Sequence, residues 1–390
     1  MAALSAVRDP VLGRGLVELG LVRSVRARWG KVSVTVARAS PGYPRSDELR
    51  RLVEEALRGL SGVKDVEVSL IDLVDSEAMT LAGILRSGAG GGIAGTSYPA
   101  PTSDAHTGPA HGGSAPLGHE EGKANAFMRP GSRTRVLGIS SGKGGVGKSS
   151  VTVNLAVALS ARGHDVAILD ADVYGFSIPR MLGLDESPML VGDLVIPPVA
   201  HGVRCLSTGF FVADETPVIW RGPMLHKALE QFLVDTHWGD PDFLLIDMPP
   251  GTGDVALSLS QYLPRSEVVV VTTPQAAAQR VAQRSAHMAK RLKLPVRGVI
   301  ENMSWFTGDE GHRYEIFGSG GGKALAGLLS VPLLGQIPLV PALRVGGDDG
   351  LPVTVSDPTG EAASAFAALA ERVEGIGPAR VYRRELTIRS

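Results

Sequence analysis

Two stretches near the N-terminus alternate apolar and polar residues, which is the pattern of half-buried β-strands. Valines alternate with polar residues in WGKVSVTVARA (residues 29–39), and VKDVEVSLIDL (residues 63–73) repeats this pattern. Between them, SDELRRLVEEALRGL (residues 46–60) carries leucine and valine at helical spacing behind a candidate N-cap, Ser46. Residues 1–86 are therefore predicted to form a small α+β domain in which a helix packs on a sheet.

From residue 133 onward the pattern changes to continuous apolar, β-branched runs separated by helical patterns. These runs are RVLGIS (135–140), DVAILD (165–170), FLLID (243–247), EVVVVTT (267–273) and VRGVI (296–300). Such runs are typical of parallel strands buried on both faces, and their alternation with helices indicates an α/β fold. Residues 133–375 are therefore predicted to form one α/β domain with a mostly parallel sheet. Ligands of such domains bind at the carboxyl ends of the strands.

Between these two regions, residues 87–132 are dominated by Gly, Ala, Pro, Ser and Thr. This composition buries too little apolar surface to offset the entropy of ordering, so a disordered linker is predicted. His106, His111 and His119 lie in it, and solvated histidines are favoured over a metal site because the spacing is irregular and no cysteine accompanies them. Residues 376–390 are assigned to a C-terminal tail.

Charge and composition narrow the function classes. The chain has 39 Lys and Arg against 40 Asp and Glu, a formal net charge of −1, which argues against a non-specific nucleic-acid binder. No apolar run reaches the roughly 18 residues of a membrane span, and the first residues lack a signal-peptide layout. We therefore expect a cytoplasmic protein with neither membrane nor nucleic acid as partner. The single cysteine, Cys205, excludes an intramolecular disulfide and a cysteine cluster for metal.

The stretch SGKGGVGKS (residues 141–149) contains the pattern G-x-x-x-x-G-K-[ST], placed after a predicted strand and before a helical pattern that Gly163 closes. Its glycines allow backbone N–H groups to wrap around a phosphate, and the helix N-terminus adds positive potential. Lys148 is predicted to neutralise the β and γ phosphates, and Ser149 to offer its hydroxyl to Mg²⁺. The predicted nucleotide-binding residues are Gly142, Lys143, Gly144, Gly145, Val146, Gly147, Lys148, Ser149 and Ser150.

Two further strands end in aspartate. FLLID ends in Asp247, at the position expected to fix Mg²⁺, and VAILDADVYG carries Asp170 and Asp172. A lone aspartate at a strand end would by default cap the next turn. Their occurrence beside a phosphate-binding loop favours a role in the nucleotide site instead.

The loop KGGVGKS, with a lysine directly after its first glycine, is similar to that of the deviant Walker-A ATPases, which include ParA and MinD. Further stretches resemble the Mrp (ApbC) iron–sulfur carrier ATPases, in family order over residues 135–355. They are DADVYGFSIPRMLG, WRGPM, LLIDMPPGTGDV, TPQ, ENMSWF, FGSGGG and LGQIPL. The N-terminal DPVLGRGLVELGLV and PGYPRSDELRRLVEEAL resemble the small PaaD-like domain often found ahead of Mrp.

This resemblance implies a P-loop ATPase that hydrolyses Mg-ATP slowly, as a homodimer with ATP between its subunits. Lys143 would reach the nucleotide of the partner subunit, as an arginine finger does in trans. The resemblance makes Lys143, Lys148 and Asp172 the catalytic residues, with Asp172 orienting the attacking water. It further assigns Asp170 to Mg²⁺ beside Ser149 and Asp247, Gly251 and Asp254 to γ-phosphate sensing, and Asn302 to the adenine edge. Apo iron–sulfur proteins or assembly factors would be its partners.

One part of the family pattern is missing. A C-x-x-C pair normally follows the ENMS segment and holds a [4Fe–4S] cluster at the dimer interface, but residues 307–312 contain no cysteine. Tyr43 stands where the N-terminal domain usually has cysteine. The cluster is thus implied by resemblance alone, without its usual ligands. Packing in a buried strand is the favoured role for Cys205, and surface charge is favoured over metal binding for Asp309, Glu310 and His312.

One alternative function remains open, and a role for the N-terminal domain is compatible with the carrier function. A ParA- or MinD-like positioning ATPase that carries no cluster would need a basic DNA-binding surface or a C-terminal amphipathic helix. The tail GIGPARVYRRELTIRS is basic but has Gly and Pro early and no apolar stripe. The N-terminal domain is interpreted as a module that brings client proteins to the ATPase on a flexible linker.

Overall fold

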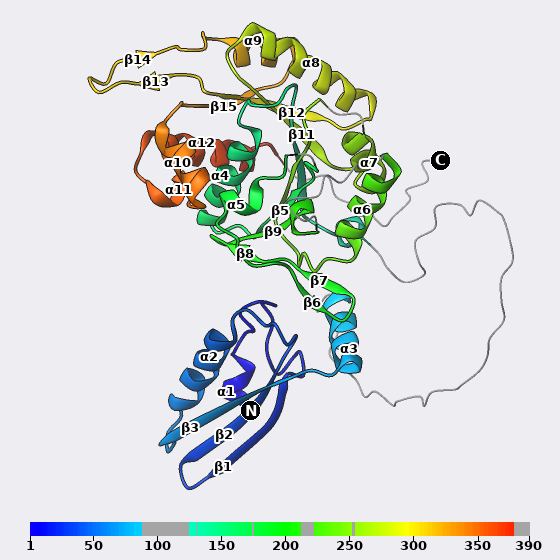
Figure 1. Ribbon diagram of the computed structural model, residues 1–390, viewed down its shortest axis with the longest axis vertical. Coiled ribbons are helices and arrows are strands. Elements are labelled where there is room, and N and C mark those ends of the chain that lie inside the picture. The colour runs from blue at the N-terminus through cyan, green and yellow to red at the C-terminus, as the bar shows by residue number, and fades with distance from the viewer. Residues whose placement is uncertain (88–124, 130, 174, 212–221, 252–253, 378–390) are drawn as a thin grey trace, which may run out of the picture.

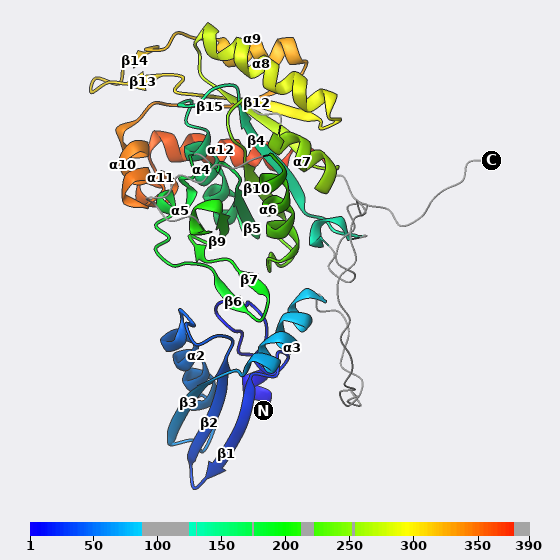
Figure 2. The same cartoon turned by 45° about the vertical axis from the view of Figure 1, so that its right-hand side comes forward.

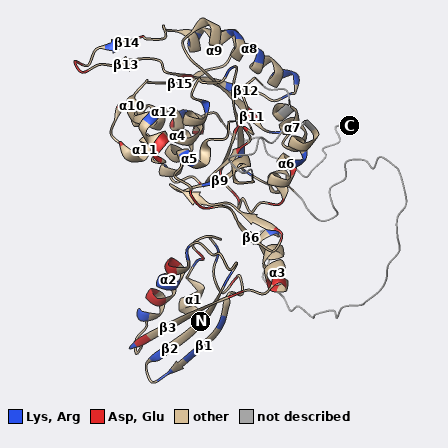
Figure 3. Ribbon diagram, viewed as in Figure 1, with Lys and Arg blue, Asp and Glu red and all other residues tan. Residues whose placement is uncertain are grey.

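The computed structural model describes residues 1–390 apart from 88–124, 130, 174, 212–221, 252–253 and 378–390. Most of the predicted linker, including His106, His111 and His119, and nearly all of the predicted tail therefore lie outside the described residues. The described elements form a small N-terminal unit and a larger unit built on a central sheet (Figure 1). Basic and acidic residues are mixed over both units (Figure 3).

The N-terminal unit has a three-stranded sheet in the order β1-β2-β3, in which β1 runs antiparallel and β3 parallel to β2. Its elements are α1 (Ala2–Ser5), β1 (Val22–Arg28), β2 (Lys31–Arg38), α2 (Ser46–Arg58), β3 (Asp65–Asp72) and α3 (Asp75–Arg86). Helix α2 buries Leu49, Val53 and Leu57. The predicted α+β domain is confirmed. One detail was wrong: Ser46 is the first residue of α2 and not its cap, because its hydroxyl donates to the Tyr43 carbonyl at 2.9 Å.

The larger unit has an eight-stranded sheet in the order β15-β12-β11-β4-β10-β5-β9-β8. Its strands are β4 (Arg135–Ser141), β5 (Val166–Asp170), β8 (Val199–Ala200), β9 (Val203–Ser207), β10 (Phe243–Asp247), β11 (Glu267–Thr272), β12 (Val296–Asn302) and β15 (Leu333–Ile337). All neighbours pair in parallel except β8 and β9. Every residue of β4, β5, β10 and β11 is buried. This burial explains their continuous apolar runs, and the predicted mostly parallel sheet is confirmed.

Helices cover both faces of this sheet (Figures 1 and 2). One face carries α4 (Lys148–Ala161), α5 (Ile178–Met181), α11 (Val353–Ser356) and α12 (Glu361–Glu374), with α10 (Pro341–Asp349) beside them. The other face carries α6 (Gly222–Val234), α7 (Asp254–Tyr262), α8 (Ala276–Arg291) and α9 (Gly321–Leu329). Val136 and Leu137, adjacent in β4, belong to opposite cores. In the described part of the chain, no helix combines the length and the apolar character that crossing a membrane requires.

The C-terminal end of the predicted linker belongs to the larger unit. A short 3-10 helix, η1 (Ala126–Met128), buries Phe127 against Trp238, with ring centroids 6.1 Å apart. The Asn125 side chain donates to the Tyr262 carbonyl at 3.1 Å. The boundary at residue 132 was therefore placed too late, because the aromatic ring of Phe127 supplies the apolar surface that the rest of the stretch lacks.

A small hairpin of the larger unit docks on the N-terminal unit. It consists of β6 (Met189–Val191) and β7 (Leu194–Ile196), and both views place it against α3 (Figures 1 and 2). Its buried residues, Met189, Val191, Leu194 and Ile196, belong to the same core as the leucines and valines of the N-terminal unit. Arg86 of α3 donates to the Asp193 carboxylate at 2.6 Å. The hypothesis that the N-terminal unit swings freely on a linker is therefore wrong in this structure, because the hairpin completes the core of that unit.

We expect Gly192→Ala to loosen this docking. Gly192 has φ +59°, and a Cβ there would lie 3.1 Å from Met79 Cα and 3.2 Å from the Ala78 carbonyl oxygen. The positive φ alone costs about 1 kcal/mol, and the contact with α3 should remove about 1–3 kcal/mol more. Denaturant unfolding measures this loss. Gly20→Ala is the matched control, because Gly20 has φ +69° with nothing within 4 Å; equal losses would contradict a stabilising contact between hairpin and α3.

Candidate nucleotide-binding site

The predicted phosphate loop joins β4 to α4 at the carboxyl edge of the sheet. Gly147 has φ +79°, and a Cβ there would lie 2.3 Å from the Asn302 side-chain nitrogen. At Gly142 a Cβ would lie 2.2 Å from the backbone nitrogen of Ala282. Only glycine fits these two positions, because neighbouring groups of β12 and α8 already occupy the space of a side chain. The loop backbone is thus held close to its neighbours, with α4 beginning at Lys148.

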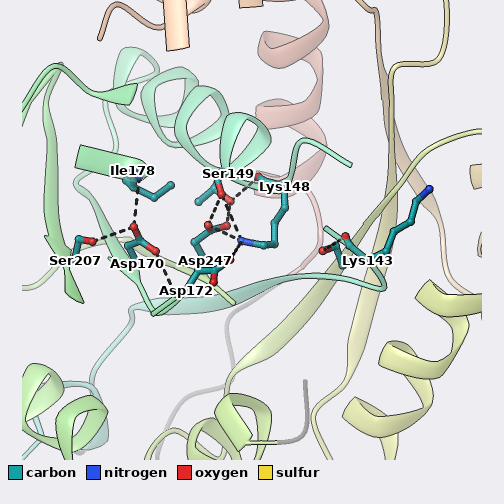
Figure 4. Close-up of polar contacts among 10 residues, drawn as sticks. Lys143, Lys148, Ser149, Asp170, Asp172, Ile178, Ser207 and Asp247 are labelled. Carbon is teal, nitrogen blue, oxygen red and sulfur yellow. Dashed lines mark hydrogen bonds and ion pairs between the residues drawn. The ribbon is translucent and has the colours of Figure 1, made fainter. Parts of the chain in front are cut away.

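Lys148, Ser149 and Asp247 come together beneath this loop (Figure 4). Lys148 is only 6% exposed, and its Nζ lies 2.6 Å from Asp247 Oδ2. The Ser149 hydroxyl donates to the same oxygen at 2.6 Å, and Thr152 Oγ1 donates to Oδ1 at 2.8 Å. Sequence reasoning missed Thr152. Its position three residues after Ser149, on the same face of α4, was the available signal.

Asp170 and Asp172 complete the cluster. Asp172 Oδ2 lies 3.7 Å from Lys148 Nζ. Asp170 is fully buried and accepts hydrogen bonds from the Asp172 backbone N–H at 3.2 Å and from the Ser207 hydroxyl at 3.0 Å. Burial and the neighbouring Asp247 carboxylate raise the pKa of Asp170 to about 7, although these hydrogen bonds and Lys148 act in the opposite direction.

The cluster therefore sets three buried carboxylates against one ammonium group. Carboxylate and hydroxyl oxygens are the ligands that Mg²⁺ prefers in proteins, and a glycine loop at a helix N-terminus suits phosphate. The residues Ser149, Asp170 and Asp247 thus fit Mg²⁺, and Lys148 with the loop fits the phosphates of a nucleotide.

Lys143 does not join this cluster within one chain. Figure 4 shows its side chain pointing away from Lys148 and Asp247, and its Nζ lies 3.3 Å from the Gln275 side-chain oxygen. Gln275 ends the TPQ stretch and was not predicted as a site residue. The catalytic role predicted for Lys143 therefore requires a second subunit.

The other predicted residues lie around the loop with different contacts. The Asn302 side chain donates to the Val146 carbonyl at 2.9 Å and is only 5% exposed, so it braces the loop. Its contact with adenine stays a prediction. Gly251, with φ +80°, donates its backbone N–H to the Ser141 carbonyl at 3.1 Å. Asp254 is the first residue of α7.

Ser150 is half-buried in the first turn of α4, and its backbone carbonyl accepts a hydrogen bond from the Asn154 side chain. Gly144 and Gly145 are exposed, whereas Val146 is buried at 2% exposure. The loop therefore presents Gly144 and Gly145 to solvent and is anchored by the Val146 side chain, which leaves the backbone of these two glycines accessible to a phosphate.

Residues other than cysteine occupy the positions where the family usually has its cluster ligands. Residues 307–312 form the hairpin of β13 (Phe306–Thr307) and β14 (Arg313–Tyr314), whose Thr307 hydroxyl donates to Glu361 at 2.8 Å. Asp309, Glu310 and His312 are exposed there, and among the described residues they belong to no group of three or more side chains that could hold a metal ion. Tyr43 is buried and donates to Asp9 Oδ1 at 2.5 Å.

Cys205 lies in β9 and is fully buried in the core, as predicted. Burial raises the pKa of its thiol, and the Asp170 and Asp247 carboxylates raise it further. A protonated, inaccessible thiol is a poor metal ligand. The residues of this chain therefore do not fit a thiolate-bound iron–sulfur cluster.

Comparisons with known proteins agree with the site. The family described as NUBPL iron-transfer P-loop NTPase matches residues 132–374, and the family described as iron–sulfur cluster assembly protein matches residues 1–70. The chain is 43% identical over 363 residues to the iron–sulfur cluster carrier protein of Mycobacterium tuberculosis, covering 91% of this chain and 87% of the relative. Against the carrier protein of Synechocystis sp. it is 37% identical over 382 residues, covering 96% of each.

A solved structure shares the larger unit. It is a nucleotide-binding protein from Archaeoglobus fulgidus in complex with ADP, 33% identical, with a TM-score of 0.51 over 60% of this chain and 91% of that protein. These matches confirm the resemblance to iron–sulfur carrier ATPases. Because the match over residues 132–374 includes the phosphate loop and both aspartate-bearing strands, this chain belongs to the family of NUBPL iron-transfer P-loop NTPases.

Proposed function

We propose that this protein is a Mg²⁺-dependent ATPase that acts in the delivery of iron–sulfur clusters to apoproteins. One observation carries the proposal. The Lys148 ammonium group lies 2.6 Å from Asp247, beneath a loop in which Gly142 and Gly147 leave no space for a side chain. The names of its relatives, iron–sulfur cluster carrier proteins, support the cargo.

In the proposed mechanism, Lys148 exchanges its contact with Asp247 for the β and γ phosphate oxygens. The Ser149 hydroxyl and the Asp170 and Asp247 carboxylates would hold Mg²⁺. When bound, Mg²⁺ supplies positive charge that stabilises the transferring phosphoryl group. Asp172, only 7% exposed, accepts a hydrogen bond from the attacking water and orients it.

We further propose that hydrolysis is slow and requires two subunits, with ATP between them. The position of Lys143 supports this arrangement. Its ammonium group points away from the phosphate site of its own chain, so it is available to the phosphates bound by a partner subunit. A second cation on the phosphoryl group then appears only when the dimer forms.

This chain supplies no accessible thiolate to a cluster. It has one cysteine, which is buried, so the ligands of a cluster come from the proteins with which it works. The same observation favours a second candidate function, a nucleotide-dependent switch related to ParA and MinD that never holds a cluster.

Anaerobic reconstitution of the purified full-length protein with iron and sulfide separates these candidates. Under our proposal, Mg²⁺-dependent ATP hydrolysis is present, and ATP accelerates activation of an apo iron–sulfur enzyme from a preformed cluster source. Bound iron with a charge-transfer absorption band would show direct carriage by this chain. An ATPase that neither binds iron nor affects the apoenzyme would sink the delivery function and leave the switch.

A further inference from the structure

A cavity of about 800 Å³ lies between the two units. The N-terminal unit contributes residues from the loop before β1 and the end of α3, and the larger unit contributes η1 and the segment after α6. Asp165 and Arg204, which also line it, stand at the amino ends of β5 and β9. Because these strands are parallel to β4, the cavity lies at the opposite edge of the sheet from the phosphate loop. It is thus a second site, separate from that of the nucleotide.

Arginines dominate the charge of this cavity. Among the described residues, five arginines line it against three carboxylates, and no lysine does so. The arginines are Arg8, Arg14, Arg86, Arg129 and Arg204. Arg14 pairs with Glu18, Arg204 with Asp165, and Arg86 with Asp193.

Arg8 and Arg129 form no ion pair with any described residue. Arg8 donates to the Gly13 carbonyl at 3.2 Å, and Arg129 donates to the Arg86 carbonyl. Each guanidinium group has five N–H donors in a planar fork. Most N–H donors of these two guanidinium groups therefore have no acceptor among the described residues. Arg8 belongs to the N-terminal unit and Arg129 to the larger unit, so each unit contributes one such group to the cavity.

Buried polar groups without partners accompany these arginines. Thr236 is only 5% exposed, yet its hydroxyl has no hydrogen-bond partner, and Nε of Arg86 has none either. Both residues line the cavity. Buried polar atoms are usually satisfied, so unpaired ones beside a cavity point to a ligand that completes them.

His237 lines the cavity and is affected by both burial and the neighbouring arginines. Burial and the charges of Arg204 and Arg14 lower the pKa of this histidine to about 4, opposed by Asp240 and by the Leu12 backbone. Its imidazole is therefore neutral at pH 7, and its environment disfavours any further cation.

We propose that this cavity binds a small polyanion, a molecule that carries two or more carboxylate or phosphate groups. Guanidinium groups bind both kinds of oxyanion through paired N–H donors. The guanidinium groups of Arg8 and Arg129, which pair with no carboxylate of the described residues, match two anionic groups. A pocket of several hundred Å³ with a few convergent polar groups is typical of small-molecule sites. Because both units supply arginines, the anion joins the N-terminal unit to the ATPase.

Calorimetric titration of the full-length protein with tricarballylate and with inorganic pyrophosphate tests this site and distinguishes the two anion classes. Pyrophosphate also fits the phosphate loop, so only the component that Mg-ADP does not displace is counted. We expect saturable binding of at least one anion. Arg8→Gln combined with Arg129→Gln should weaken it about tenfold or more, because two charged hydrogen-bonding groups are lost.

The control combines Arg26→Gln with Arg291→Gln, two exposed arginines from β1 and α8 that do not line the cavity. It removes the same charge and should leave the affinity unchanged. Neither double variant removes an ion pair between described residues, and matched melting temperatures verify that both fold. The proposal is overturned if neither anion binds saturably, or if both double variants lose affinity equally.

Discussion

Lys148→Ala is expected to lower the affinity for ATP about 100-fold, because it removes the charged donor beneath the phosphate loop. The ammonium group lies 2.6 Å from Asp247 and 3.7 Å from Asp172. Without it, the phosphates would meet three buried carboxylates and no cation in the cluster. Since like charges repel strongly where water is excluded, the loss should exceed that of an ordinary hydrogen bond.

A fluorescent ATP analogue titrated into the purified variant measures this affinity. Lys323→Ala is the matched control, because Lys323 is an exposed lysine of α9. The unliganded variant should also unfold at a lower temperature, since Asp247 loses its ion pair, and the titration is therefore run below that temperature. Parent-like affinity in the folded Lys148→Ala protein would contradict the assignment of this residue to the phosphates.

Lys143→Ala is expected to reduce the rate of ATP hydrolysis about 10³-fold, the lower range for a cation supplied in trans to a phosphoryl group. Nucleotide affinity of the single subunit should change little, because Lys143 lies outside the Lys148 cluster and its side chain donates to Gln275, away from the phosphate site. Steady-state phosphate release at saturating ATP measures the effect, with the nucleotide titration run in parallel.

Gln275→Ala separates this role from simple bracing of the loop. It removes the contact of Lys143 within the chain and leaves the lysine itself in place. Under the proposed dimer it hydrolyses ATP near the parent rate, whereas bracing alone predicts equal losses in both variants. A mixture of Lys143→Ala and Lys148→Ala proteins should regain activity, since each supplies what the other lacks. Parent-rate hydrolysis by Lys143→Ala would show that the role across the dimer is wrong.

Local patterns determined much of this protein. FLLID predicted β10 at residues 243–247, where the structure has it, because a strand buried on both faces must be apolar throughout. The glycine pattern from Gly142 to Ser149 predicted a phosphate loop between a strand and a helix. Such a loop needs backbone conformations and close approaches that only glycine allows. The strand β1 was not singled out, because VRSVRAR leaves most of its residues exposed and shows no clear alternation.

Tertiary structure alone decided the contacts between residues that lie far apart in the chain. The sequence determined the strands with a clear apolar or alternating pattern, the phosphate loop and the absence of thiolate ligands, because each follows from residue types and spacing within a short segment. Only the fold set Thr152 against Asp247, closed the N-terminal core with a hairpin from residues 189–196, and gathered Arg8 and Arg129 at one cavity. Some contacts of this kind join segments more than a hundred residues apart in the chain. The periodicity of one segment gives no information about which distant segment it will contact.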